Sequence, residues 1–258
     1  MSPEARQKLV QDYVNRVEFA SLEELAREVD ASVSTVRRDI AALEVAGGLR
    51  RTHGGARLLN PHSDEFVFNT RDTHQLAEKE AIGRACAELI RPNQTVIIDA
   101  GTTTYHVARN LESKTPQIIT NSLPVALFFA AANRVEMILS GGVIYPRLGV
   151  LVGPLAVEAF SKIHADVAVM SAGGITLEGI SNSHGLLIEI QLAMLRAAQK
   201  VIFCFDSTKL GRRSVSALCG LDRVHTIVTD WGAPDDLVKS LRERGLEVVI
   251  AYKEGAGL

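Results

Sequence analysis

The sequence has little of what marks a disulfide-rich, metal-binding or membrane-spanning protein. Its three cysteines (Cys86, Cys204 and Cys219) are too widely spaced for a disulfide framework or a metal-binding knuckle. The longest apolar runs, such as 123–132, are too short to cross a bilayer. The N-terminus has charges where an export signal needs an apolar core. The absence of GxxxxGK[ST] and GxGxxG patterns disfavours a nucleoside triphosphate or dinucleotide ligand. We therefore expect a cytoplasmic globular protein that binds no metal and no cofactor.

An excess of charge of one sign is also missing. The 258 residues have a formal net charge of −2, and the first 57 carry nine Lys/Arg and nine Asp/Glu. The basic residues are unevenly distributed, however, because the segment 37–57 contains five arginines against only Asp39 and Glu44. A locally positive stripe on a neutral module is typical of a nucleic-acid-binding surface.

The first 59 residues predict three short helices followed by a β-hairpin. A capping box at Ser21–Glu24 begins the second helix, and the hydroxyl residues of Ser32–Thr35 begin the third. Gly47-Gly48 ends the third helix. A two-stranded hairpin is expected to follow, with its turn at Gly54-Gly55. Residues 1–59 are therefore predicted to form a winged helix-turn-helix domain.

The third helix and the hairpin carry the predicted DNA-binding residues. Ser34 and Thr35 offer hydroxyls near a helix N-terminus. Arg37 and Arg38 point about 100° apart, so one is expected at base edges and the other at a phosphate, with Asp39 orienting one of the arginines. The hairpin residues expected to contact the DNA backbone are Arg50, Arg51, His53 and Arg57. One alternative to DNA binding is that the arginine pair only forms a solvated helix face. The other is that the winged helix binds a protein.

The remainder of the chain alternates between β-branched and helical segments. A connecting segment is expected at 60–75, a long helix at about 70–90, and an effector-sensing domain at 76–258. Alternation of this kind predicts an α/β fold whose mostly parallel sheet has helices on both faces. The predicted strands are 95–99, 118–120, 135–139, 166–171, 201–205, 226–229 and 247–250.

Small polar turns follow three of these strands. They are Asp99–Thr104, Thr120–Ser122, and the turn formed by Ser140, Gly141 and Gly142. Taken alone, each turn consists of residue types that are common in loops and need not bind a ligand. Together they meet at the carboxyl edge of a parallel sheet, where helix N-termini favour an anion. Asp206–Lys209 adds a charge pair at the same edge. The pattern therefore predicts a ligand that carries a phosphate.

The segment Thr35–Ile40 (TVRRDI), followed by Arg51–Ala56 (RTHGGA), resembles the motif of DeoR-type transcriptional regulators, and the resemblance extends over the whole chain. The sensor half of this family is similar to ribose-5-phosphate isomerase, and both carry Asp-x-x-Lys where this chain has Asp206–Lys209. The resemblance implies a repressor of a sugar or related-metabolite operon. Such a regulator binds operator DNA as a dimer or tetramer and is released by a phosphorylated sugar.

The resemblance also implies roles for individual residues. Asp99, Glu189 and Lys209 would face sugar oxygens. The residues that would hold the phosphate are Gly101, Thr102, Thr103, Thr104, Asn121 and Ser122. The residues that would line the pocket are Gly141, Gly142, Gly173 and Gly174.

Two positions depart from the patterns of these families. Sugar-phosphate isomerisation needs a carboxylate cluster as general acid and base, but Ser171–Gly174 contains no acid. We therefore expect binding without turnover and no catalytic residue; the alternative is an isomerase-like enzyme fused to a winged helix. Many family members carry Glu-x-Lys near Glu189, whereas this chain has Gln191. His184 offers a substitute donor, or else a helix cap.

Overall fold

The structure is a computed structural model with two compact units, residues 1–66 and 67–258. It describes residues 2–253 except 18, 46, 53, 59–67 and 133–134; of 15–17, 19, 57 and 58 it describes only the backbone. No helix within this described part is long and apolar enough to cross a bilayer.

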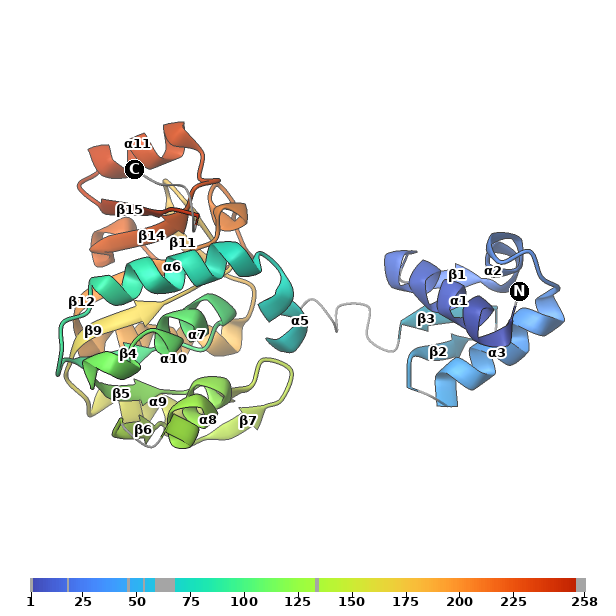
Figure 1. Ribbon diagram of the computed structural model, residues 1–258, viewed down its shortest axis with the longest axis horizontal. Coiled ribbons are helices and arrows are strands. Elements are labelled where there is room, and N and C mark those ends of the chain that lie inside the picture. Colours follow the sequence, from blue (N-terminus) through green and yellow to red (C-terminus); the bar gives the residue numbers. More distant parts are fainter. Residues whose placement is uncertain are drawn as a thin grey trace. The chain divides into compact units, whose positions relative to one another are not determined.

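The first unit combines helices with a small antiparallel sheet (Figure 1). Its described elements are α1 (Pro3–Val17), β1 (Phe19–Ser21), α2 (Leu22–Glu28), α3 (Val33–Val45), β2 (Leu49–Thr52) and β3 (Gly55–Leu58). The capping box that begins α2 is confirmed, because the Ser21 hydroxyl accepts from the Glu24 amide while the Glu24 carboxylate accepts from the Ser21 amide. The apolar helix faces meet in one core that includes Leu25 and Ile40.

The sheet of the first unit has one strand more than the predicted two-stranded hairpin. Strand β1 pairs antiparallel with β3, which places Ser21 opposite Gly55 and gives the order β1-β3-β2. The close approach of β1 requires a glycine, because a Cβ at Gly55 would lie 2.1 Å from the Ala20 carbonyl oxygen. Gly54 has no such neighbour within 4 Å.

We predict that Gly55→Ala destabilises the first unit and that Gly54→Ala does not. Overpacking of this kind typically costs about 1–3 kcal/mol. Thermal melting of the two variants, compared with the wild type, measures the difference. Equal melting temperatures for both variants would contradict the close packing of β1 on the hairpin.

The second unit is built on a parallel sheet, as predicted. In its described part the strand order is β15-β14-β12-β9-β4-β5-β6, and every neighbouring pair is parallel. The strands are β4 (Thr95–Ile98), β5 (Gln117–Thr120), β6 (Met137–Leu139), β9 (Ala165–Met170), β12 (Ala198–Cys204), β14 (Thr226–Asp230) and β15 (Glu247–Ala251). All of the predicted strands are therefore confirmed, with small changes at their ends.

Helices cover both faces of this sheet (Figure 1). One face is covered by α6 (Leu76–Glu88), α7 (Thr102–Arg109) and α8 (Leu123–Ala132), and the other by α9 (Pro154–Ser161) and α10 (Gly185–Ala197). Ile82, Val107 and Phe129 are fully or almost fully buried in the core of the first face.

The predicted helix at 70–90 is two helices. Helix α5 (Phe68–Thr73) is separated from α6 by Gln75, whose φ of 52° and ψ of 43° are left-handed. Helix α5 therefore occupies part of the expected connecting segment 60–75 and belongs to the second unit. No glycine or proline in the sequence indicates this break. The break depends on the contacts that α5 makes with α7.

Smaller antiparallel elements, which the sequence did not predict, lie beside the main sheet. Strands β7 (Val143–Tyr145) and β8 (Val150–Val152) form one pair. Strands β10 (Gly174–Thr176), β11 (Gly179–Asn182) and β13 (Ser216–Cys219) form a second sheet. They contribute the turn that carries Arg147 and the residues that lead into α10.

Candidate functional site

Helix α3 presents its predicted DNA-binding residues to solvent. Ser34, Arg37 and Arg38 are exposed and Thr35 is half-buried, whereas Val36 and Ile40 on the opposite face are fully buried. The helix begins at a hydroxyl cluster, because the Ser32 Oγ lies 2.9 Å from both the Ser34 Oγ and the Thr35 Oγ1. The two guanidinium groups are therefore on the accessible face, as contact with DNA requires.

Asp39 orients an arginine, but not one on α3 or the hairpin. It is 3% exposed, and it accepts from Arg6 Nε at 2.6 Å and from Arg6 Nη2 at 3.1 Å. Gln7 Nε2 donates to the same carboxylate at 3.3 Å. This two-pronged pair joins α1 to α3, so it sets the position of the helix that carries Arg37 and Arg38.

The β2–β3 hairpin, or wing, carries further exposed arginines. Arg50 and Arg51 on β2 are exposed, and the backbone amide of Arg51 donates to the Glu44 carboxylate at 2.9 Å, which joins the end of α3 to the wing. Arg57 stands opposite Arg50 in the register of β2 and β3, but its side chain lies outside the described part of the structure. His53 lies outside the described residues altogether.

The second candidate site lies where the order of the parallel strands reverses. The chain builds β4, β5 and β6 outward and then returns to place β9 on the other side of β4. In open α/β sheets, ligands bind at the carboxyl ends of the strands at such a point. Asp99 follows β4 and Ser171 follows β9. A Cβ at Gly101 would lie 2.3 Å from the Ser171 Oγ, so the two loops are in close contact.

A buried hydrogen-bond network joins these loops to α10. We call Asp99, Ser171, Asn182 and Gln191 the Asp99 network. Gln191 Nε2 donates to Asp99 Oδ2 at 2.7 Å and to the Ser171 carbonyl at 2.8 Å, and Asn182 Nδ2 donates to Gln191 Oε1 at 2.9 Å. The amides of Ala100 and Ser171 also donate to Asp99. Gln191, where many family members have lysine, therefore links Asp99 to Asn182.

Asp99 titrates in an unusual range. It is 2% exposed, and burial raises the pKa of its carboxyl to about 6. The hydrogen bonds from Gln191, Ser171 and Ala100 and the positive charge of Arg71 oppose this rise in pKa. Arg71 on α5 therefore contributes to the electrostatic surroundings of Asp99.

Basic side chains from separate segments influence the same titratable groups; we call Arg71, Lys79, Arg147 and Lys209 the basic cluster. Lys79 is 4% exposed, and burial is the main cause that lowers its pKa to about 8. The carboxylates of Asp206 and Asp72 raise the pKa of Lys79, whereas the charges of Arg71 and Lys209 lower it further.

His184 lies near two members of this cluster. Burial lowers its pKa, and the charges of Arg147 and Arg71 lower it further. Its ring also meets that of Tyr145 at a centroid distance of 5.6 Å. His184 stands at the N-cap of α10, but its side chain makes no capping hydrogen bond.

Several predicted ligand-binding hydroxyls serve the local backbone instead. The Thr104 Oγ1 is within 2.6 Å of the Asp99 carbonyl and 2.9 Å of the Gly101 carbonyl, so its proton is not available to a ligand in this structure. The Ser122 Oγ accepts from the Val125 amide at the start of α8, and the Ser140 Oγ donates to the Gly141 carbonyl. Thr102 and Thr103 are buried in the first turn of α7.

The predicted glycines permit close packing of the backbone. Gly141 and Gly142 have φ of 72° and 116°, and a Cβ at Gly142 would lie 2.6 Å from the Val152 carbonyl oxygen. Gly173 and Gly174 leave no room for a Cβ beside Ser214 and the Arg212 carbonyl, respectively. Their role in this structure is to admit neighbouring segments.

Two further predicted residues differ in exposure, because Glu189 is exposed and Asn121 is buried. Glu189 is exposed and lies about 200° around α10 from Gln191, so it points away from the Asp99 network. Its expected contact with sugar oxygens is therefore not supported by the structure. Asn121 is fully buried; its Nδ2 donates to the Leu151 carbonyl, while its Oδ1 has no hydrogen-bond partner among the described residues. A buried acceptor left in this state costs free energy, which a ligand donor would recover.

The sequence interpretation missed Arg71, Lys79 and Arg147. One signal was present for Lys79, which lies three residues before Ile82 and seven before Cys86, on the apolar face of its helix. Nothing local marks Arg71 or Arg147, because they reach the site through the docking of α5 and the β7–β8 turn.

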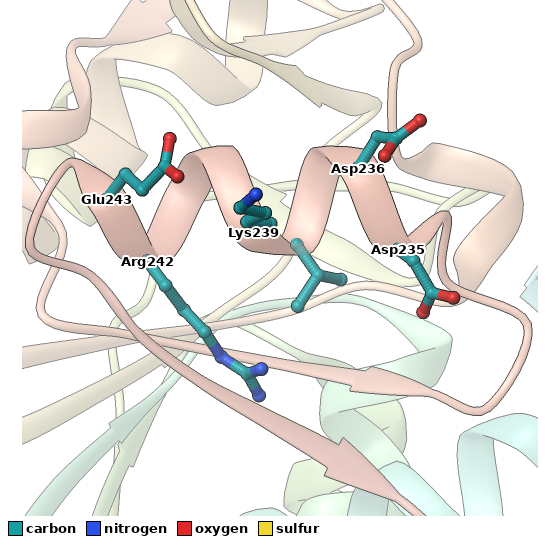
Figure 2. A pocket seen from close by; sticks show the side chains of 6 residues that line it. Asp235, Asp236, Lys239, Arg242 and Glu243 are labelled. Atoms are coloured by element: carbon teal, nitrogen blue, oxygen red, sulfur yellow. The ribbon is translucent and has the colours of Figure 1, made fainter.

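A surface hollow of about 540 Å³ is lined by residues of α11 (Asp235–Glu243), whose charged side chains diverge from the helix (Figure 2). There, Asp235 and Asp236 lie in the first turn, and Arg242 donates to the Val248 carbonyl at 2.8 Å. These are ordinary interactions of a surface helix with its own termini and the neighbouring strand. This hollow contains no predicted site residue.

Comparison with known proteins identifies the family of the chain. The family model described as the DeoR C terminal sensor domain matches residues 74–231, and that described as the DeoR-like helix-turn-helix domain matches residues 6–62. The chain belongs to the DeoR family. This DeoR-family chain is 32% identical over 253 residues to the "HTH-type transcriptional regulator GolR" of Listeria innocua, covering 97% of this chain and 100% of the relative.

Other relatives carry names that state a direction of regulation. The "L-fucose operon activator" of Haemophilus influenzae is 29% identical, with 95% of this chain and 99% of the relative covered. The "Putative aga operon transcriptional repressor" of Escherichia coli O157:H7 is 29% identical, with 96% and 93% covered. Ribose 5-phosphate isomerase from Plasmodium falciparum has a TM-score of 0.39 at 14% identity over 53% of each chain, which is too low to support an argument about function.

Membership of the DeoR family settles two expectations. The chain is a DNA-binding transcriptional regulator, and the expectation that it is not an enzyme is confirmed, since its relatives are named as regulators. The alternative of an isomerase-like enzyme fused to a winged helix is not supported.

We predict that Asp99→Asn changes the pH dependence of stability. With a pKa of about 6 instead of the ordinary 3.8, the folded protein binds a proton at Asp99 more tightly than the unfolded chain does. The free energy of unfolding contributed by Asp99 therefore falls as the pH rises through that interval. Between pH 4 and pH 7 the melting temperature of the wild type should fall relative to that of the variant. If the difference between the two melting temperatures stayed constant over this pH range, the pKa of Asp99 would not be raised.

Proposed function

We propose that this regulator represses a sugar or related-metabolite operon in the cytoplasm, and that a phosphorylated sugar bound beside the Asp99 network weakens its hold on DNA. The observation that carries this proposal is the buried ammonium of Lys79, which donates to the Arg71 carbonyl and lies in the field of the Arg71 and Lys209 charges. A buried cation gains stability when an anion comes close to it.

The polar groups around the cluster suit the remainder of a sugar phosphate. Asp99 accepts hydrogen bonds within the network, and the unpartnered Oδ1 of Asn121 is an acceptor for a ligand hydroxyl. Lys209 follows β12 on a short 3₁₀ turn whose N-cap is Asp206. The Ser207 amide donates to Asp230 at 2.6 Å, which fixes this turn to the neighbouring strand. A ligand with one phosphate and several hydroxyls matches these groups.

In this proposal, α3 contacts the bases of the operator and the wing contacts its phosphate backbone. The exposed Arg37 and Arg38 lie on a helix that the Arg6–Asp39 pair holds in place. One such module contacts half of an operator, and symmetric half-sites require two modules.

A homo-oligomer, dimer or tetramer, supplies the second module in this proposal. Support comes from exposed apolar side chains on α8, β7 and α9, among them Leu127, Val143 and Leu155, which are 71%, 68% and 67% exposed. Helix α8 (LPVALFFAAA) contains no charged residue on any face, which is unusual for a surface helix. A second copy of the chain would cover these side chains. Sedimentation of the full chain measures its oligomeric state.

We predict that Arg37→Ala weakens binding to the chain's own upstream DNA without changing the melting temperature. Loss of a bidentate contact with guanine costs about 1–3 kcal/mol of discrimination, which corresponds to roughly 5- to 150-fold in affinity. Arg27→Ala, which removes an arginine on α2, is the matched control. Gel-shift titration at constant salt provides the measurement, and unchanged retardation by Arg37→Ala would contradict the assignment of α3.

We predict that phosphorylated sugars, but not the parent sugars, raise the melting temperature of the second unit. At a hundredfold excess over Kd the stabilisation is about 2.7 kcal/mol. Lys209→Ala should abolish this response and leave DNA affinity intact, whereas Lys239→Ala on α11 should behave as the wild type. A thermal-shift panel of pentose and hexose phosphates tests the proposal. Equal stabilisation of wild type and Lys209→Ala would place the ligand elsewhere.

A further inference from the structure

Helix α5 lies on the surface of the second unit. None of its six residues is buried. The Phe68 ring meets Tyr105 edge-on at 5.5 Å, and the Phe68 amide donates to the Arg147 carbonyl at 3.1 Å. Asp72 Oδ1 lies 3.1 Å from His106 Nε2. An element that buries so little apolar surface undocks at low free-energy cost.

Two of the contacts of α5 belong to the proposed effector site. The buried ammonium of Lys79 donates to the Arg71 carbonyl in the last turn of α5. The Arg71 side chain contributes its charge to the surroundings of Asp99, Lys79 and His184. The basic cluster therefore includes one cation that is present only while α5 is docked.

We propose that α5 is the element through which effector occupancy reaches the DNA-binding unit. This inference rests on the function proposed above and adds its mode of regulation. An anion that bridges Arg71 to Lys79 and Lys209 holds α5 against α6 and α7. Because α5 is the first described element after residues 59–67, a change in its docking moves the point at which the second unit joins the remainder of the chain.

The direction of the effect follows from linkage. Docked α5 adds a cation to the ligand's surroundings, so docking favours binding, and binding favours docking by the same factor. When the effector is bound, α5 therefore stays docked on the second unit. In the effector-free protein, α5 undocks more often.

Hydrogen exchange with inorganic phosphate as the probe tests this proposal on the full chain. Adding phosphate at constant ionic strength should slow exchange of the α5 amides and lower affinity for the upstream DNA about tenfold, within the usual range of coupling. Phe68→Ala removes the ring contact of α5 without touching a charged group. In this variant, phosphate should still raise the melting temperature, but it should no longer change DNA affinity.

Phe128→Ala is the matched control, because Phe128 on α8 also meets Tyr105 edge-on, at 6.3 Å. It should respond to phosphate as the wild type does. Arg71→Gln keeps the carbonyl that Lys79 binds but removes the cation; phosphate should stabilise this variant without slowing α5 exchange.

Either of two results overturns the coupling. The first is a Phe68→Ala protein whose α5 exchanges faster but whose DNA affinity still responds to phosphate as in the wild type; the proposed effector site would then stand without α5. The second is a wild type that phosphate does not stabilise, which contradicts the effector site and the coupling together.

Discussion

The carboxylate of Asp99 remains in the interior of the second unit because hydrogen-bond donors from separate segments surround it. The Gln191 side chain comes from α10, the Ser171 amide from the end of β9 and the Ala100 amide from its own turn. A buried carboxylate without such donors would cost several kcal/mol. These segments must therefore meet at one place, and the packing there leaves no room for a side chain at Gly101. The geometry of the candidate effector site follows from this requirement.

The chain carries two groups of cations that differ in burial, and the difference suits two kinds of anion. Arg37 and Arg38 are exposed on a helix that the Arg6–Asp39 pair positions, so salt screens them and they suit a long polyanion with many phosphates. Lys79 is buried among other charges, where screening is weak and one small anion has a large effect. The basic cluster is therefore suited to a metabolite, and the surface of α3 and the wing to duplex DNA.

Much of the fold could be predicted because its determinants are local. Helix caps such as Ser21 and Ser32 act within one turn, and each strand of the main sheet is a short β-branched run between turns. Strand β1 and the break at Gln75 could not be predicted. Strand β1 exists because β3 lies beside it, and the left-handed conformation of Gln75 lets α5 turn back onto α7.

The sequence by itself determined the two-part organisation, the exposed arginines of α3, and the edge of the sheet at which polar turns gather, because each depends on neighbours along the chain. Only the tertiary structure decided which polar groups share the effector site. It separated Glu189 from Asp99, used the Thr104 hydroxyl within its own turn, and brought the buried ammonium of Lys79 to the Arg71 carbonyl. The physical reason is that charges interact through space, and residues far apart in the chain become neighbours only when the sheet and its helices have packed.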